Sequence, residues 1–304
     1  MRDELQKALD TTGLRGRVVK AFVEKHGHRY QVGLAELEDG RKVVVKNKRT
    51  GRASYGAAYT REAEHKNLIL LQRLGKTQIP EPIAYADGVL VMSFIDGATM
   101  RSADPKDLNE GIFTDVGALY RKINDLAPDE PGRFLTFRDV RSVFAHEFEL
   151  LFAERLALEH LPKSFYEGVR DTVLAHEAMG RPCDIGLIAK DACGHENILV
   201  KDGRLTGLID FEDLLVGPRM LQLRVELEPR FRAALREGYG ADLYDRNWDE
   251  RLSAAFRLIS TLRALYNALH ETPVDPAWIS HIRERYAECA RTLGIDAPLP
   301  DITA

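Results

Sequence analysis

The spacing of apolar residues divides this chain into a strand-rich first part and a helical remainder. Short apolar runs separated by turn pairs such as Asp39-Gly40 and Asp87-Gly88 occur up to about residue 95 and are typical of strands. We expect strands at 22–30, 31–42 and 41–46 and a pair that flanks Asp87-Gly88 and ends near Met92. After Pro80 and Pro82 have ended the first helix, most apolar residues recur at helical spacing. The predicted helices cover 61–75, 104–124, 138–160, 163–179, 220–237, 249–270 and 277–293. These elements predict an α+β fold with two lobes: a β-rich lobe over residues 1–95, with an antiparallel sheet and one helix, and a mostly helical lobe over residues 96–304.

The helix predicted at 61–75 carries a charged residue in its apolar stripe. Leu68 and Leu71 lie four and seven residues after Glu64 and therefore share its face. Because a glutamate is almost never buried unpaired, Glu64 needs a cationic partner. The natural candidate is Lys46, which ends the strand predicted at 41–46. Glu62 points to the opposite face. The alternative is that Glu64 lies at the frayed amino end of the stripe.

Residues 197–213, NILVKDGRLTGLIDFED, predict a hairpin with a polar residue at each end. Asn197 precedes the first strand, Lys201-Asp-Gly forms the turn, and Asp210 follows the second strand. Across the hairpin, the amide oxygen of Asn197 and the carboxylate of Asp210 would converge. Mg²⁺ takes oxygen ligands and relies on few protein groups, so this pair predicts a magnesium site. The alternative is an ordinary hairpin with polar ends.

The residues before the hairpin, AKDACGHEN at 189–197, carry a resemblance to a known family. With GRLTGLIDF and the pair Asp210 and Asp213, they resemble the aminoglycoside phosphotransferase and choline kinase-like family of the protein-kinase-like fold. Its members have HGD, four residues and Asn. The order of strands, lysine and helix in the first lobe also resembles RIO-type atypical kinases.

The family resemblance implies a two-lobed kinase-like fold and an enzyme that moves the γ-phosphoryl group of ATP or GTP to a hydroxyl with the help of Mg²⁺. By the same resemblance, Asp191 would be catalytic, Asn197 and Asp210 would hold Mg²⁺, and the remaining site residues would bind the nucleotide. That nucleotide-binding set is Lys46, Glu64, Met92, Ser93, Phe94 and Ile95, of which the last four would line the adenine site.

The catalytic loop departs from the family pattern. Ala189 and Lys190 replace the family's His and Gly, and five residues separate Asp191 from Asn197 instead of four. One extra residue displaces the chain by up to about 3.8 Å, so the loop must bulge to keep Asp191 in place, and Gly194 makes a bulge easier. Without the bulge, Ala192 takes the catalytic position. The alternative that follows from these departures is a pseudokinase, in which Lys190 neutralises the acidic site. The resemblance of the first lobe implies a further alternative, a RIO-like protein Ser/Thr kinase. A glycine-rich phosphate loop is missing, since Gly27 and Gly33 are too few.

Composition and charge argue against several classes of partner and site. A net charge of −4 over 304 residues gives no footprint for nucleic acid. No apolar run reaches about 18 residues, and the amino terminus has no signal-peptide core, so we expect a cytoplasmic protein with no membrane span. The three cysteines argue against a disulfide framework. Cys193 and His195 are too few ligands for zinc.

The expected partner is a small-molecule hydroxyl substrate, aminoglycoside-like or another cationic metabolite. Acidic residues that could attract it are Glu226, Glu228, Asp242 and Asp245; a protein substrate is the alternative.

Overall fold

The computed structural model describes most of the chain: residues 1–22, 30–48, 61–75, 78–128, 133–153, 162–190, 192, 194–223, 229–269 and 276–300. Contacts group the chain into two compact units. The first unit comprises Met1–Leu135, Gly186–Leu215 and Val225–Ala241, and the second unit comprises Thr136–Ile185, Val216–Arg224 and Asp242–Ala304. The lobe boundary predicted at residue 95 stays a prediction.

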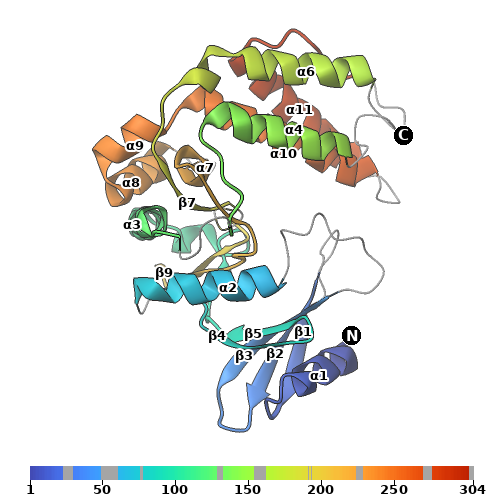
Figure 1. Ribbon diagram of the computed structural model, residues 1–304, viewed down its shortest axis with the longest axis vertical. Coiled ribbons are helices and arrows are strands. Elements are labelled where there is room, and N and C mark those ends of the chain that lie inside the picture. Colours follow the sequence, from blue (N-terminus) through green and yellow to red (C-terminus); the bar gives the residue numbers. More distant parts are fainter. Residues whose placement is uncertain are drawn as a thin grey trace. The chain divides into compact units, whose positions relative to one another are not determined.

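A five-stranded antiparallel sheet forms the amino-terminal part of the first unit (Figure 1). Its strands, in spatial order, are β1 (Gly16–Phe22), β2 (Tyr30–Leu37), β3 (Lys42–Lys48), β5 (Val89–Ser93) and β4 (Pro82–Ala86). Tight turns join β2 to β3 and β4 to β5. Gly40 and Gly88 both have positive φ there, which glycine adopts at little cost. The predicted antiparallel sheet is confirmed.

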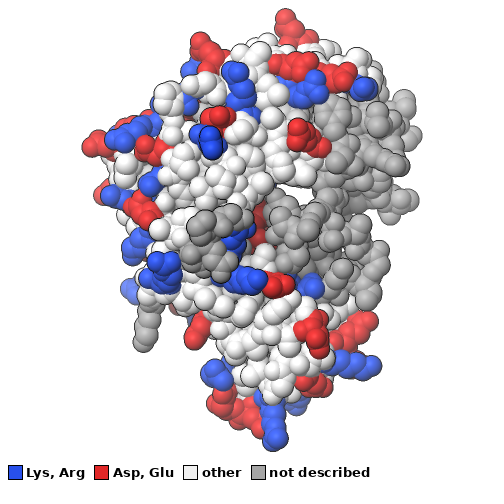
Figure 2. Space-filling view, in the orientation of Figure 1, with Lys and Arg blue, Asp and Glu red and all other residues white. Residues whose placement is uncertain are grey.

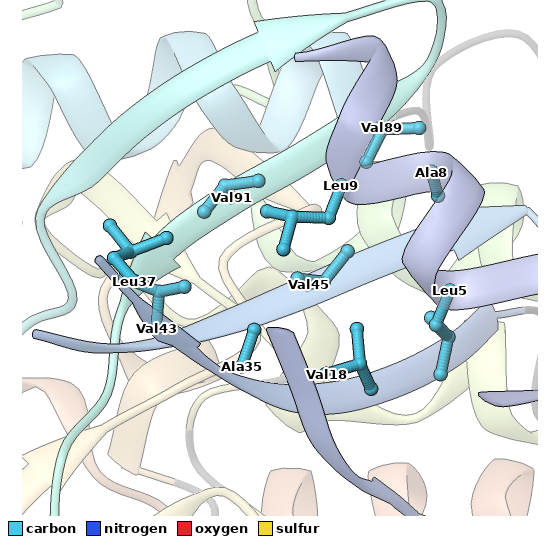
Figure 3. Close-up of a cluster of buried hydrophobic side chains, with 10 residues drawn as sticks. All are labelled: Leu5, Ala8, Leu9, Val18, Ala35, Leu37, Val43, Val45, Val89 and Val91. Atoms are coloured by element: carbon cyan, nitrogen blue, oxygen red, sulfur yellow. The ribbon is translucent and has the colours of Figure 1, made fainter. Parts of the chain in front are cut away.

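The sheet has two differently covered faces because successive side chains of a strand point to opposite sides. Val43 and Val45 of β3 are fully buried and lie in the cluster that the first helix, α1 (Arg2–Thr11), covers with Leu5 and Leu9 (Figure 3). Lys46 belongs to the other set of alternating positions, and it contacts the second helix, α2 (Arg61–Leu71). The two helices therefore cover opposite faces of the sheet. Because side chains alternate along β3, Lys46 lies on the face that α2 covers.

The rest of the first unit carries the hairpin predicted at 197–213. Strands β8 (Ile198–Lys201) and β9 (Arg204–Leu208) pair antiparallel, and β6 (Ala98–Thr99) adds a third strand beside β8. β7 (Ile185–Ala189) and β10 (Leu214–Pro218) form a separate two-stranded sheet, whose residues are divided between the two units. The helices α3 (Glu110–Asp125) and α8 (Pro229–Tyr239) pack closely against each other in this unit.

Glycines make that helix contact close. A Cβ atom on Gly238 of α8 would lie 1.9 Å from the carbonyl oxygen of Thr114 in α3. A Cβ atom on Gly117 of α3 would lie 2.3 Å from the carbonyl oxygen of Leu235. Any side chain at either glycine would push α3 and α8 apart.

Helices make up most of the second unit: α4 (Val140–Ala153), α6 (Lys163–Ala175), α7 (Met220–Leu223), α9 (Ala241–Asn247), α10 (Glu250–Leu269) and α11 (Pro276–Leu293). The carboxylate of Asp249 accepts hydrogen bonds from the backbone N–H groups of Arg251 and Leu252 and pairs with Arg181 at 2.7 Å. Asp249 therefore caps α10 and ties it to the segment before β7.

Several predicted elements differ from the observed ones at their ends. The helix predicted at 104–124 begins at Glu110, because the side chain of Asn109 caps α3 there while Pro105–Asp107 forms a short 3₁₀ turn (η2); two further 3₁₀ turns cover Gln72–Leu74 (η1) and Glu177–Gly180 (η3). The helix predicted at 220–237 contains α7 and α8, with 224–228 outside the described residues. The strand predicted at 22–30 lies mostly outside them, and β1 precedes it.

Charged side chains of both signs are interspersed over the face of the molecule in Figure 2. Among the described residues, no helix is long and apolar enough to cross a membrane.

Candidate active site

Lys46 is the centre of a buried charged cluster. Its Nζ lies 2.8 Å from an Oε atom of Glu64 on α2 and 2.7 Å from an Oδ atom of Asp210, which follows β9. The side chains of Lys46 and Glu64 are only 8% and 1% exposed, so the pair is withdrawn from water. The contact between Lys46 and Glu64 that the apolar stripe predicted is present. The frayed-end alternative is wrong, because Glu64, although in the first turn of α2, is buried and paired with Lys46.

The β8–β9 hairpin brings Asn197 and Asp210 to the same end. Ile198 pairs with Leu208, and the N–H of Ile209 donates to the carbonyl oxygen of Asn197 at 2.9 Å. Asn197 therefore lies opposite Ile209, and Ile209 directly precedes Asp210. The backbone of the hairpin thus brings Asn197 and Asp210 to the same end, as the sequence predicted. Whether the two side chains share a metal ion stays a prediction.

Asp210 has an unusual backbone. Its φ is +67°, in the left-handed region, which aspartate tolerates better than most residues with a side chain and which Asp87 and Asp202 also adopt in hairpin turns. Residues with a side chain adopt this region in turns and at functional sites. With this backbone, the carboxylate of Asp210 lies 2.7 Å from Nζ of Lys46.

A third carboxylate joins the cluster. Oxygen atoms of Glu64, Asp210 and Glu212 all lie within 4.8 Å of one another. Glu212 is buried, at 7% exposure. The sequence reasoning missed Glu212 and weighed Asp213 instead. The available signal was that Glu212 is an acidic residue in the same short segment as Asp210 and Asp213; strand spacing does not mark it, because Asp210 has a φ of +67°.

The charges of this cluster perturb one another. Burial favours the neutral amine of Lys46, but the negative charges of Asp210, Glu64 and Glu212 outweigh burial and raise the pKa of Lys46 well above its ordinary value. Burial is also the main cause that raises the pKa of Glu64 to about 7, because Lys46 offsets it only in part while Asp210 and Glu212 add like charge. With one ammonium among three carboxylates, the cluster has excess negative charge, which suits a cation.

The segment predicted to line an adenine site ends β5. Met92 is buried, and the N–H groups of Ser93 and Phe94 donate to the carbonyl oxygens of Glu81 and Lys42 at 2.8 Å and 3.2 Å. These two donors are used within the protein. An adenine contact in this segment would therefore need other backbone groups, such as those of Ile95.

The predicted catalytic residue, Asp191, lies outside the described residues, as does Cys193. The residues on both sides of Asp191 are buried. Lys190 is buried, at 7% exposure, where β7 ends. Ala192 is fully buried, and its carbonyl oxygen accepts from the hydroxyl of Tyr120 at 3.3 Å. The role of Asp191 stays a prediction.

The acidic residues that could attract a cationic substrate are only partly described. Glu226 and Glu228 lie outside the described residues. Asp242 and Asp245 belong to α9 in the second unit.

The sequence matches the model of one protein family. Residues 25–256 match the model of the phosphotransferase enzyme family. No curated protein matches the sequence closely enough to count as a relative.

Solved structures with a similar fold include macrolide 2'-phosphotransferase MphH from Brachybacterium faecium, with a TM-score of 0.65 and 16% identity over 98% of this chain and 99% of that one. The ADP-bound aminoglycoside phosphotransferase APH(2'')-Ib has a TM-score of 0.62 and 16% identity, over 95% of this chain and 96% of that one. Spectinomycin phosphotransferase APH(9)-Ia, in complex with ADP and spectinomycin, has a TM-score of 0.63 and 12% identity, over 96% and 97% of the two chains. At these identities the likeness shows the fold, and it confirms the predicted α+β class.

Proposed function

Because this chain belongs to the phosphotransferase enzyme family, we propose that it transfers the γ-phosphoryl group of ATP or GTP to a hydroxyl group of a small molecule. The family match confirms the family and the enzyme class predicted from the catalytic loop and the hairpin. The resemblance to RIO-type kinases stays a prediction. In the proposal, residues 1–95 bind the nucleotide and residues 96–304 carry catalysis and the acceptor.

The observation that carries the proposal is the contact of Lys46 with both Glu64 and Asp210. Phosphoryl transfer needs little covalent help from the protein, and most of its acceleration comes from positioning and neutralising charge. Lys46 places one buried positive charge beside the end of the hairpin, where it would hold nucleotide phosphates. Glu64 fixes the ammonium, and the sheet and α2 hold the two partners rigidly.

The residues around Lys46 fit a magnesium ion in their chemistry. Asp210 and Glu212 offer carboxylate oxygens, and Asn197 offers an amide oxygen at the same end of the hairpin. Mg²⁺ bound there would neutralise charge on the phosphates. Asp210 and Asn197 are the ligands that we propose, and Glu212 adds negative charge beside them.

Asp191 is the residue that we propose to orient the acceptor hydroxyl and to accept its proton. The complete burial of Ala192 supports this assignment. A residue without solvent exposure, whose carbonyl oxygen is bound to Tyr120, does not line an open acceptor site. We therefore favour the bulged loop, in which Asp191 keeps the catalytic position.

The acceptor that we propose is a small polyhydroxylated molecule of the aminoglycoside or macrolide kind, or another cationic metabolite. Solved structures of similar fold are those of a macrolide phosphotransferase and of a spectinomycin complex, which supports a small-molecule acceptor over a protein.

The test is transfer of labelled phosphate from γ-labelled ATP and GTP to a panel of aminoglycosides, macrolides and amino sugars. We expect Mg²⁺-dependent labelling of at least one acceptor. We expect Asp191→Asn to reduce its rate by about 10²–10⁴-fold with nucleotide affinity retained. Glu62→Gln is the matched control, because Glu62 is exposed on the other side of α2. Labelling by Asp191→Asn at the parent rate would refute the assignment of the base.

A second candidate is a nucleotide-binding protein without turnover. The buried Lys190, directly before Asp191, is the observation that favours it. In this case the parent protein would bind nucleotide in a Mg²⁺-dependent way but would neither label an acceptor nor hydrolyse ATP. The variant Lys190→Gly would gain turnover.

A further inference from the structure

We propose that Asn67 is a positioning residue for Asp210 and thereby sets the affinity of the site for the divalent cation that accompanies the nucleotide. The inference rests on the proposed function, because it gives Asp210 a role in binding that cation. It extends the site to a residue that touches neither nucleotide nor metal.

Asn67 lies one helical turn after Glu64 on α2 and is buried, at 3% exposure. Its Nδ2 donates to the carbonyl oxygen of Phe211 at 2.8 Å. Its Oδ1 accepts from Nη2 of Arg133 at 2.9 Å. Residues three apart on a helix share a face, so α2 directs Glu64 to Lys46 and Asn67 to the residue after Asp210.

The two partners fix the orientation of the Asn67 amide. A guanidinium can only donate hydrogen bonds, and a backbone carbonyl can only accept them. The side-chain oxygen must therefore face Arg133, and the side-chain nitrogen must face Phe211. A flipped amide would lose both hydrogen bonds in a buried place, where an unmade hydrogen bond is costly.

The hydrogen bond from Asn67 completes a clamp around Asp210. On one side, the N–H of Ile209 is bound to the carbonyl oxygen of Asn197 at 2.9 Å. On the other side, Asn67 holds the carbonyl oxygen of Phe211, whose side chain is fully buried. Between these two fixed points Asp210 is in the left-handed region, at a φ of +67°. Without the bond from Asn67, the segment can relax toward an ordinary φ, and the carboxylate would turn away from Lys46.

Helix α2 therefore positions two residues of the site. The same rigid helix sets the position of Lys46 through Glu64 and that of Asp210 through Asn67. The group that holds phosphate and the group that holds the cation are therefore aligned by one element.

Asn67→Asp tests the bond to Phe211 selectively. An aspartate keeps an acceptor for Arg133 but faces the carbonyl of Phe211 with a second oxygen, so that contact becomes repulsive. The assay is a titration of MgCl₂ into protein and a non-hydrolysable ATP analogue, with the affinity of the analogue in EDTA measured separately. We expect half-saturation at an Mg²⁺ concentration about tenfold higher than in the parent, with affinity in EDTA within about twofold.

Asn124→Asp is the matched control. Asn124 is also buried, its Nδ2 donates to the carbonyl oxygen of Leu187, and its Oδ1 accepts from the hydroxyl of Tyr239. This second asparagine supports β7 instead of the segment after β9. We expect Asn124→Asp to lower the unfolding temperature and to leave the Mg²⁺ titration unchanged. An equal shift in both variants would mean a general structural effect and would overturn the proposal.

Arg133→Met keeps the inference testable if Asn67→Asp does not fold. It leaves Asn67 in place but removes the bond that orients its amide, and we expect an Mg²⁺ half-saturation about threefold higher. A folded variant of either kind with the parent's Mg²⁺ titration would overturn the role of Asn67. If Asp210→Asn shifts the titration in the same experiment, the proposed function survives that result. If Asp210→Asn leaves the titration unchanged too, the proposed function fails with it.

Discussion

Glu64→Gln should change how the stability of the protein depends on pH. Burial and the neighbouring carboxylates raise the pKa of Glu64 from 4.5 to about 7. A tenfold change in acidity is worth about 1.4 kcal/mol, so this shift corresponds to roughly 3 kcal/mol. The folded protein holds a proton on Glu64 more tightly than the unfolded chain does. Glu64 therefore costs nothing below about pH 4.5, and it lowers the free energy of unfolding progressively as pH rises toward about 7.

The glutamine variant keeps an oxygen acceptor for Lys46 but cannot ionise. We expect the free energy of unfolding of Glu64→Gln, minus that of the parent, to increase by roughly 3 kcal/mol between about pH 4.5 and about pH 7.5. Urea unfolding followed by circular dichroism at several pH values measures this difference, and taking the difference cancels the groups that do not interact with Glu64. A difference that does not change with pH would refute the assigned pKa.

Glu62→Gln is the matched control for this experiment. Glu62 lies on the same helix, but its carboxylate is exposed and paired with Lys66, which lowers its pKa. A lowered pKa gives the opposite sign, since its stabilisation is present above the unfolded pKa and is lost as pH falls. We expect only a small effect there, because exposed ion pairs contribute little.

Three further changes test the site and both units. Lys46→Met should reduce the rate of phosphoryl transfer by about 10²-fold or more at saturating nucleotide, whereas Lys66→Met on the exposed side of α2 should leave that rate unchanged. Gly238→Ala should destabilise the protein by up to about 3 kcal/mol in urea unfolding, because its Cβ would lie 1.9 Å from the Thr114 carbonyl. Gly168→Ala, in open space on α6, should instead stabilise it by about 0.5–1 kcal/mol, and equal effects would contradict the close helix contact. Asp249→Ala should cost about 1–2 kcal/mol, since it removes the cap of α10 and the partner of the partly exposed Arg181, and a loss no larger than that of the exposed Asp171→Ala would contradict this role.

The parts of the site that the sequence predicts are those in which a charge conflicts with its surroundings. Glu64 in an apolar stripe required a cation, and Lys46 supplies it at 2.8 Å. The hairpin followed from two apolar runs and a turn with a glycine.

Other features left little trace in the sequence. Helix α1 was not predicted, since its apolar residues Leu5, Ala8 and Leu9 are few among charged ones and gain their burial only from the sheet. Asn67 has no charge to conflict with its apolar neighbours, so its hydrogen bond to Phe211 depends on a segment 144 residues away that only the fold brings close. The left-handed backbone of Asp210 is likewise not marked in the sequence, since no glycine stands there.

The measurement that tests the central claim most directly is nucleotide binding by the parent and by Asp210→Asn, with and without Mg²⁺. Asp210 contacts Lys46 and ends the hairpin, so its carboxylate should carry the cation-dependent part of binding. We predict that Mg²⁺ strengthens ATP or GTP binding to the parent by about tenfold or more, and that Asp210→Asn loses this gain while keeping the affinity measured in EDTA. Equal affinity of the two proteins for the magnesium–nucleotide complex would contradict the assignment of the site.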